Sequence, residues 1–115
     1  MIERLGVVMC YVSEMGRAVA FYRTVLGSEP AHESEHWSEF VLPGGIRLGL
    51  HPGGSGGATG GFVPGLIVPS LAEAASRIAA TGYSVPAEPH GIPGGREIEL
   101  ADPDGNRLQL IELTS

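Results

Sequence analysis

Gly45-Ile46-Arg47-Leu48-Gly49-Leu50 recurs sixty positions later as Gly105-Asn106-Arg107-Leu108-Gln109-Leu110. The apolar run from Val7 to Val12 also recurs, 56 positions later, from Val63 to Val68. An internal repeat on this scale predicts two similar supersecondary units that share one core. A functional site would then lie between the two copies, where equivalent positions face each other.

The size and composition of the chain are those of one globular domain. It has 115 residues, of which 43% are hydrophobic and 17% are charged. The net charge of −6 argues against a nucleic-acid partner, because binding to the phosphate backbone needs many Lys and Arg side chains. We therefore expect a single domain over 1–115, with one module at about 3–52, a glycine-rich linker or lid at 53–61, and a second module at about 62–113.

Cysteine content and hydropathy indicate the cellular setting. Cys10 is the only cysteine and lies in an apolar run, which excludes an internal disulfide and predicts a buried, inert thiol. No stretch approaches the roughly 20 apolar residues that a membrane helix needs, so we expect no membrane partner. The short apolar stretch after Met1 has no signal-type cleavage site. A cytoplasmic location is the expectation.

The periodicity of each copy predicts a strand, a helix and three further strands. In the first copy we expect a strand over 7–12, a helix that Ser13 caps and Gly27 ends, and strands near 30–34, 37–42 and 46–51. In the second copy we expect a strand over 63–68, a helix from the capping box at Ser70 to Gly82, and strands near 84–88, 96–101 and 107–113. This order corresponds to an α+β fold of two tandem βαβββ modules.

Two motifs give the chain a family resemblance. Val12-Ser13-Glu14-Met15 leads through Phe21-Tyr22-Arg23 to Leu26-Gly27, and Asp102-Pro103-Asp104-Gly105-Asn106 follows near the C-terminal end. This pattern resembles the vicinal oxygen chelate superfamily, which includes glyoxalase I, extradiol dioxygenases, fosfomycin-resistance enzymes and bleomycin-resistance proteins. The resemblance covers about residues 3–113. It implies paired modules whose sheets curl into an open, eight-stranded cup with helices on the outer face, usually in a homodimer.

The resemblance also implies where a divalent metal would be held. The family's His, Glu or Gln ligands lie on the first and last strands of each module, and those positions correspond here to Val7, Gly49, Val63 and Gln109. Valine and glycine side chains offer no lone pair, and one neutral amide cannot retain a divalent ion against water. We therefore expect no metal and no cofactor. His51 keeps open an unusual metal site, because it follows Gly49 by two residues and so shares its strand face.

The other histidines have plainer interpretations. His32 and His36 have a spacing that would suit zinc on a helix, but their polar, non-periodic surroundings favour a solvated strand or loop. His90 lies in a segment rich in Pro and Gly and is expected in a surface loop.

Strand alternation predicts which side chains line the cup. Leucines 48, 50, 108 and 110 should pack under the helices, which turns their neighbours inward. The expected ligand-binding residues are Val7, Met9, Tyr11, Trp37, Arg47, Gly49, Val63, Ile67, Glu97, Arg107, Gln109 and Ile111. The expected candidates for catalysis are Glu39, His51 and Glu99.

Several of these residues allow two interpretations. Glu39 with Arg47, and Glu99 with Arg107, are either cross-strand ion pairs or carboxylates whose pKa is raised toward that of a general base by a partly apolar cup. Trp37 and Tyr11 are either core packing or rigid faces for a planar ligand.

Two functions from different classes follow. The first is a metal-free binding protein that captures an amphipathic or planar small molecule, as bleomycin-resistance proteins do. The second is a glyoxalase-like enzyme that isomerises, eliminates or cyclises a carbonyl compound. It would use Glu39, His51 or Glu99 as the base, and Arg47 or Arg107 to stabilise an enolate. In either case we expect a homodimer, because an open cup leaves sheet edges and an apolar rim exposed.

Overall fold

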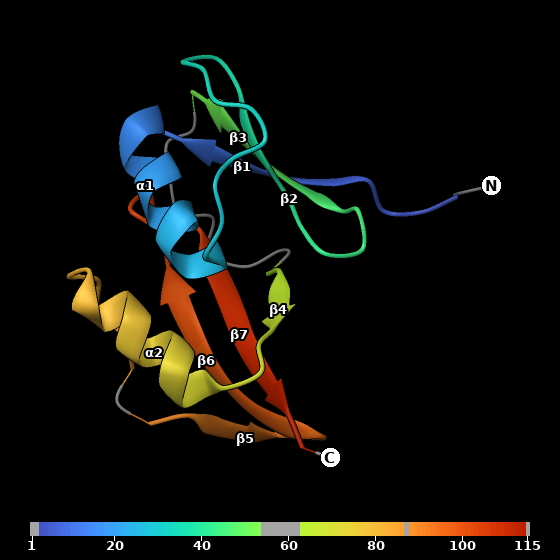
Figure 1. Ribbon diagram of the computed structural model, residues 1–115, viewed down its shortest axis with the longest axis vertical. Helices are drawn as coiled ribbons and strands as arrows, with labels where there is room; N and C mark the ends of the chain where they lie inside the picture. The colour runs from blue at the N-terminus through green and yellow to red at the C-terminus, as the bar shows by residue number, and fades with distance from the viewer. Residues whose placement is uncertain (1–2, 54–62, 87, 115) are drawn as a thin grey trace.

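A computed structural model describes residues 3–53, 63–86 and 88–114 and shows two helices and seven strands in these ranges (Figure 1). The elements in chain order are β1 (Val7–Val12), α1 (Met15–Leu26), β2 (Ser38–Val41), β3 (Arg47–Pro52), β4 (Gly65–Ile67), α2 (Leu71–Ala80), β5 (His90–Ile92), β6 (Gly95–Ala101) and β7 (Arg107–Leu113). This α+β arrangement confirms the predicted fold class. Apart from Gly53, the expected linker at 53–61 lies outside the described residues.

The strands form two sheets with matching topology. The first has the order β1-β3-β2 and the second the order β4-β7-β6-β5, with a parallel pair, β1–β3 or β4–β7, at the start of each. Met9 lies opposite Gly49 in the first sheet, and Gly65 lies opposite Gln109 in the second. These positions differ by 56 and 60 residues, the same offsets that relate the two copies in the sequence, so the structure confirms the predicted repeat.

The caps of the helices agree with the sequence in part. Glu14, and not Ser13, is the N-cap of α1, because its carboxylate accepts hydrogen bonds from the backbone N–H groups of Gly16 and Arg17. The Ser13 backbone N–H donates instead to Asp104, which explains why the predicted cap was wrong. At the other end, Gly27 ends the helix with φ of 66°.

The predicted N-terminal cap of α2 is confirmed. Ser70 is the N-cap, and its hydroxyl accepts a hydrogen bond from the Glu73 backbone N–H at 3.1 Å. The helix ends at Ala80, and Thr81 is its C-cap. Gly82 comes next and has a φ of 94°.

Two predicted strands differ from the structure. The one near 30–34 is reduced to an isolated bridge between His32 and Glu39. The one near 84–88 is wrong, because the strand before β6 is β5 at His90–Ile92. A two-residue turn at Pro93-Gly94 places β5 opposite the start of β6, whereas Pro86 and Pro89 have no N–H to donate to a ladder. The described residues therefore contain seven strands and not eight.

Both helices lie on one side of the sheets in Figure 1, and the core fills the space between them and the strands. The four alternating leucines, at positions 48, 50, 108 and 110, are buried there with Phe21, Phe40, Ile78 and Ile98. The face of each sheet turned away from the helices is called the cup face below.

A network at the Asp102 turn joins the two modules. The Tyr22 hydroxyl donates to Asp102 Oδ2 at 2.8 Å, and Asn106 Nδ2 donates to the Tyr11 carbonyl at 2.9 Å. Burial raises the pKa of the Tyr22 phenol, which therefore stays protonated and able to donate. Burial also raises the pKa of the nearby Cys10 thiol, as expected of an unreactive cysteine. Neither helix among the described residues has the length and apolar character needed to cross a membrane.

Candidate functional site

The cup face of the first sheet carries an exposed apolar row and a polar cluster. Val7, Met9 and Tyr11 alternate along β1 with side chains about half exposed, while the intervening residues turn toward the core. Arg47, Gly49 and His51 follow the same alternation on β3, beside Glu39 on β2. The structure thus places these predicted site residues on one surface; their roles in binding remain predictions.

Trp37 lies directly over Gly49. A Cβ atom built on Gly49 would be 2.5 Å from Cζ2 of the indole and closer still to Cη2, so a larger side chain cannot occupy this position without moving the ring. Gly49 is buried although it belongs to the otherwise exposed cup face, because the ring covers it. The sequence signal for this contact was a glycine inside a strand, which often marks a close approach by another group.

Glu39 holds Trp37 and Arg47 together. The Trp37 Nε1–H donates to Glu39 Oε1 at 2.8 Å, and Arg47 Nη1 donates to Oε2 at 2.7 Å. These interactions, the indole hydrogen bond first and the guanidinium second, lower the pKa of the Glu39 carboxyl despite its burial. Of the two interpretations of Glu39, the contacts therefore agree with the ion pair: both carboxylate oxygens are engaged, and the pKa is lowered and not raised.

His51 has a fixed ring hydrogen and lies near two aromatic rings. Its Nδ1 lies 2.6 Å from the Pro52 carbonyl oxygen, which can only accept, so Nδ1 carries a hydrogen. When the ring is neutral, Nε2 therefore keeps its lone pair. The ring lies edge-on to Tyr11 at 5.7 Å between centroids and to Trp37 at 6.3 Å. These three side chains form a cluster, called here the aromatic cluster.

The cup face of the second sheet combines apolar and acidic groups. Gln109 lies over Gly65, with Oε1 3.2 Å from where a Cβ would stand. Glu99 accepts a hydrogen bond from Arg107 at 2.6 Å, as the ion-pair interpretation predicts. The apolar side chains of Ile67 and Ile111 lie on the same face, and Val63, which precedes β4, is 42% exposed. Glu97 is also there but is buried, and its Oε2 has no hydrogen-bond partner within the part of the chain that the structure describes.

The residues at the family's metal positions do not fit a metal. Val7 and Val63 present hydrocarbon, and the Trp37 ring occupies the space at Gly49 where a ligating side chain would stand. Gln109 contributes a neutral amide alone. No group of three His, Cys, Asp or Glu side chains within the described ranges is placed to hold a metal ion.

The remaining histidines are not part of the aromatic cluster as defined here, although His36 precedes Trp37 in the chain and His32 pairs with Glu39. His32 and His36 are exposed in the segment before β2, as expected. His90 is exposed too, but it belongs to β5 and not to a loop, and it lies opposite Glu97 in the strand register.

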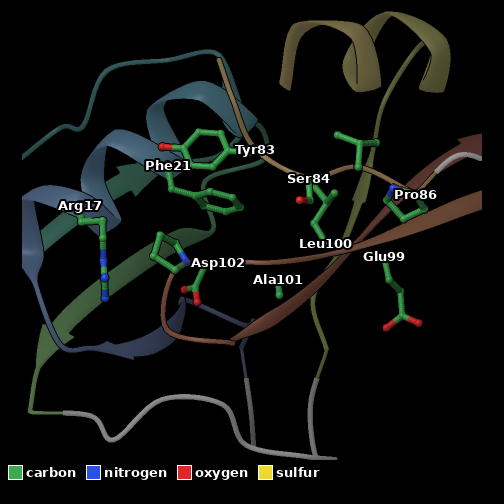
Figure 2. Close-up of a pocket in the computed structure, with 11 residues that line it drawn as sticks. Arg17, Phe21, Tyr83, Ser84, Pro86, Glu99, Leu100, Ala101 and Asp102 are labelled. Atoms are coloured by element: carbon green, nitrogen blue, oxygen red, sulfur yellow. The ribbon is translucent and has the colours of Figure 1, made fainter. Parts of the chain in front are cut away.

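A hollow of about 680 Å³ lies outside the cup face, between α1, the segment 83–86 and the end of β6 (Figure 2). Leu100 points into it beside Phe21 and Tyr83, whereas the carboxylate of Glu99 points away. Its acidic group, Asp102, is already held by the Asn106 and Asp104 backbone N–H groups and the Tyr22 hydroxyl. This hollow therefore belongs to the structural joint between the modules, and sequence reasoning did not anticipate it.

Comparison with known proteins supports this assignment of the fold. The model of the Glyoxalase/Bleomycin resistance protein/Dioxygenase superfamily matches residues 4–110. A lactoylglutathione lyase of Salmonella typhimurium is 31% identical, in a match that covers 95% of this chain and 92% of that protein. A glyoxalase/bleomycin resistance protein from Catenulispora acidiphila has a TM-score of 0.76 at 27% identity, covering 96% of this chain and 100% of its own. The fosfomycin resistance protein FosX from Listeria monocytogenes has a TM-score of 0.82 at 23% identity, covering 99% and 96%.

Proposed function

Because this chain belongs to the glyoxalase/bleomycin resistance protein/dioxygenase superfamily, we propose that it captures a planar or amphipathic small molecule on its cup face without using a metal. The single observation that carries the proposal is the position of Trp37 over Gly49. At Gly49, the position on β3 that corresponds to a metal ligand of the superfamily, the indole ring of Trp37 fills the space.

The aromatic cluster supports binding of a flat ligand. Trp37 is held in place by its hydrogen bond to Glu39, so its ring is oriented before any ligand arrives. A rigid aromatic face loses little conformational freedom on binding, which favours affinity. The exposed row of Val7, Met9 and Tyr11 extends this apolar surface along β1.

The bleomycin-resistance branch of the superfamily implies capture of a ligand without chemical conversion. Such capture needs neither a metal nor a cofactor. The chemistry of the four family positions is consistent with it, because three of them cannot donate a lone pair. A second copy of the chain would close the open cup, so we include a homodimer in the proposal.

Trp37 is the only tryptophan of the chain, so its fluorescence reports on this surface alone. We expect planar aromatic compounds from a screened library to change its emission saturably. Gly49→Ala should displace the ring and weaken the binding of such a compound by roughly tenfold or more. Gly91→Ala is the matched control, because a Cβ there meets nothing within 4 Å.

Two results would contradict the proposal. One is binding on which Gly49→Ala has no effect. The other is a stoichiometric transition metal that stays with the purified protein after dialysis against a chelator, as measured by elemental analysis.

The orientation of His51 favours one second candidate, a lyase or isomerase that acts on a carbonyl compound. Its Nε2 lone pair could accept a proton from the carbon next to the carbonyl, while Arg47 or Arg107 stabilises the resulting enolate. Under this alternative, His51→Gln would keep ligand binding and lower turnover by about 10²–10⁴. Turnover that His51→Gln leaves unchanged would exclude His51 as the base.

A further inference from the structure

Glu97 is an unusual residue for the interior of a strand. It is 8% exposed, and its buried Oε2 has no hydrogen-bond partner among residues 3–53, 63–86 and 88–114. Taking a carboxylate out of water without such a partner costs free energy, so folded proteins rarely keep one unless it has a role. We infer that Glu97 recognises a cationic or N–H-bearing group of the ligand, an inference that rests on the proposed binding function.

The described residues around Glu97 supply no partner for its Oε2. On the cup face it lies between His90 on β5 and Ile111 on β7, and neither supplies a hydrogen bond to Oε2. No ion pair found among the described residues includes Glu97. The nearest basic residue on the same face of β7, Arg107, is paired with Glu99.

Its place on β6 puts Glu97 where a ligand could supply the missing partner. Glu97 and Glu99 follow each other on the cup face, whereas Ile98 and Leu100 between and beyond them are buried under the helices. The small remaining exposure of Glu97 shows that it lies just below that surface. A ligand that covers this face and brings an N–H donor would satisfy the carboxylate.

The chemistry of the carboxylate defines the class of ligand. An ionised carboxylate only accepts hydrogen bonds, and it accepts best from a cation such as an amidinium or a protonated amine. The net charge of −6 favours the approach of such a cation. The aromatic cluster on the other sheet favours a planar ligand. Together with Glu97 it defines the ligand class as a planar molecule with an amidinium, amine or amide group, and not a planar anion.

The first test measures stability without any ligand. Glu97→Gln keeps the size of the side chain but buries a neutral amide in place of an unpaired charge, which costs less. We expect its Tm to rise by about 2–5 °C. The control, Glu88→Gln, changes an exposed residue before β5 and should leave Tm unchanged. A Tm that falls in Glu97→Gln would show that the carboxylate already has a structural partner and would overturn the inference.

The second test uses three probes of nearly equal shape, namely benzamidine, benzamide and benzoate, with binding followed by the NMR signals of the backbone N–H groups of His90 and Ile98, which lie opposite and next to Glu97, and of the Trp37 indole N–H. We expect benzamidine to bind at least tenfold more tightly than benzoate. This preference should disappear in Glu97→Gln and persist in Glu88→Gln.

The other outcomes separate the inference from the proposed function. Equal binding of all three probes would overturn the role of Glu97 and leave the proposed function standing. If no probe at millimolar concentration moves either the Trp37 signal or the backbone signals next to Glu97, both fail. If Glu97→Gln dissociates a dimer of the protein, the second copy supplies the partner of the carboxylate, and the inference is wrong.

Discussion

The side chain at position 49 is a single hydrogen atom, and this makes room for the Trp37 ring on the cup face. The ring in turn hydrogen-bonds to Glu39, whose other oxygen binds Arg47. Gly49 thus determines what this surface presents, because the Trp37 indole lies where a ligating side chain would stand and its N–H engages the Glu39 carboxylate.

Acidification should release Trp37 from Glu39. The folded protein lowers the pKa of this carboxyl, so the interaction stabilises the fold above the ordinary glutamate value of about 4.3. That stabilisation is lost as the pH falls from about 4.3 through the lower pKa of the folded state. We expect the Trp37 emission to titrate with a midpoint below 4.3 in wild-type protein.

Glu39→Gln removes the titrating group and should abolish this transition before global acid unfolding sets in. A wild-type midpoint above 4.3 would be incompatible with the ion pair described for Glu39.

The alternation of side chains along a strand places core residues on one face and candidate binding residues on the other. Along β7, Leu108 and Leu110 face the helices and are buried, whereas Gln109 and Ile111 belong to the cup face. The same division holds on β3, so each of these two strands contributes one row to the core and one to the candidate site.

Leu108→Ala should lower the free energy of unfolding by about 2–5 kcal/mol, because it leaves a cavity at a site that is 1% exposed. Leu113→Ala is the matched control on the same strand, where the side chain is 59% exposed, and should change stability by well under 1 kcal/mol. Urea unfolding measures both. Similar losses of unfolding free energy in the two variants would mean that the buried and exposed faces of β7 are assigned wrongly.

Across the whole molecule, the turn from Asp102 to Asn106 ties the second module to Tyr22 and Tyr11 of the first. Seven large apolar side chains of the described residues on or beside the cup faces are at least 42% exposed. These are Val7, Met9, Tyr11, Val41, Val63, Ile67 and Leu113. So much apolar surface on a small chain is typical of an interaction site.

We expect light scattering at micromolar concentration to report twice the chain mass of 12.0 kDa. Ile67→Glu should shift the protein toward monomer, because it puts a charge on the most exposed of these apolar side chains. Ala72→Glu, on the exposed side of α2, should leave the dimer intact. A wild-type monomer, or a dimer that Ile67→Glu does not weaken, would argue against closure of the cup by a second copy.

Local patterns were sufficient to predict most of the fold. The repeat predicted the two modules, and the leucine alternation predicted which face of β3 and of β7 is buried, because both follow from short-range periodicity. Ser70 and Gly27 were assigned correctly, since capping depends on the residue itself and its immediate neighbours. The role of Glu14 as the N-cap of α1 was missed, because the distant Asp104 engages Ser13. The position of β5 was missed, because two prolines move the strand pairing to His90.

The candidate site depended more on tertiary contacts. Sequence placed Trp37, Gly49 and Glu39 on one surface, but a face assignment does not give distances or hydrogen bonds. The indole over Gly49, the lowered pKa of Glu39 and the unpaired oxygen of Glu97 each arise from groups on neighbouring strands whose side chains meet only after the sheets form. Periodicity determines which way a side chain points, whereas its chemistry is decided by the partners that the folded chain brings to it.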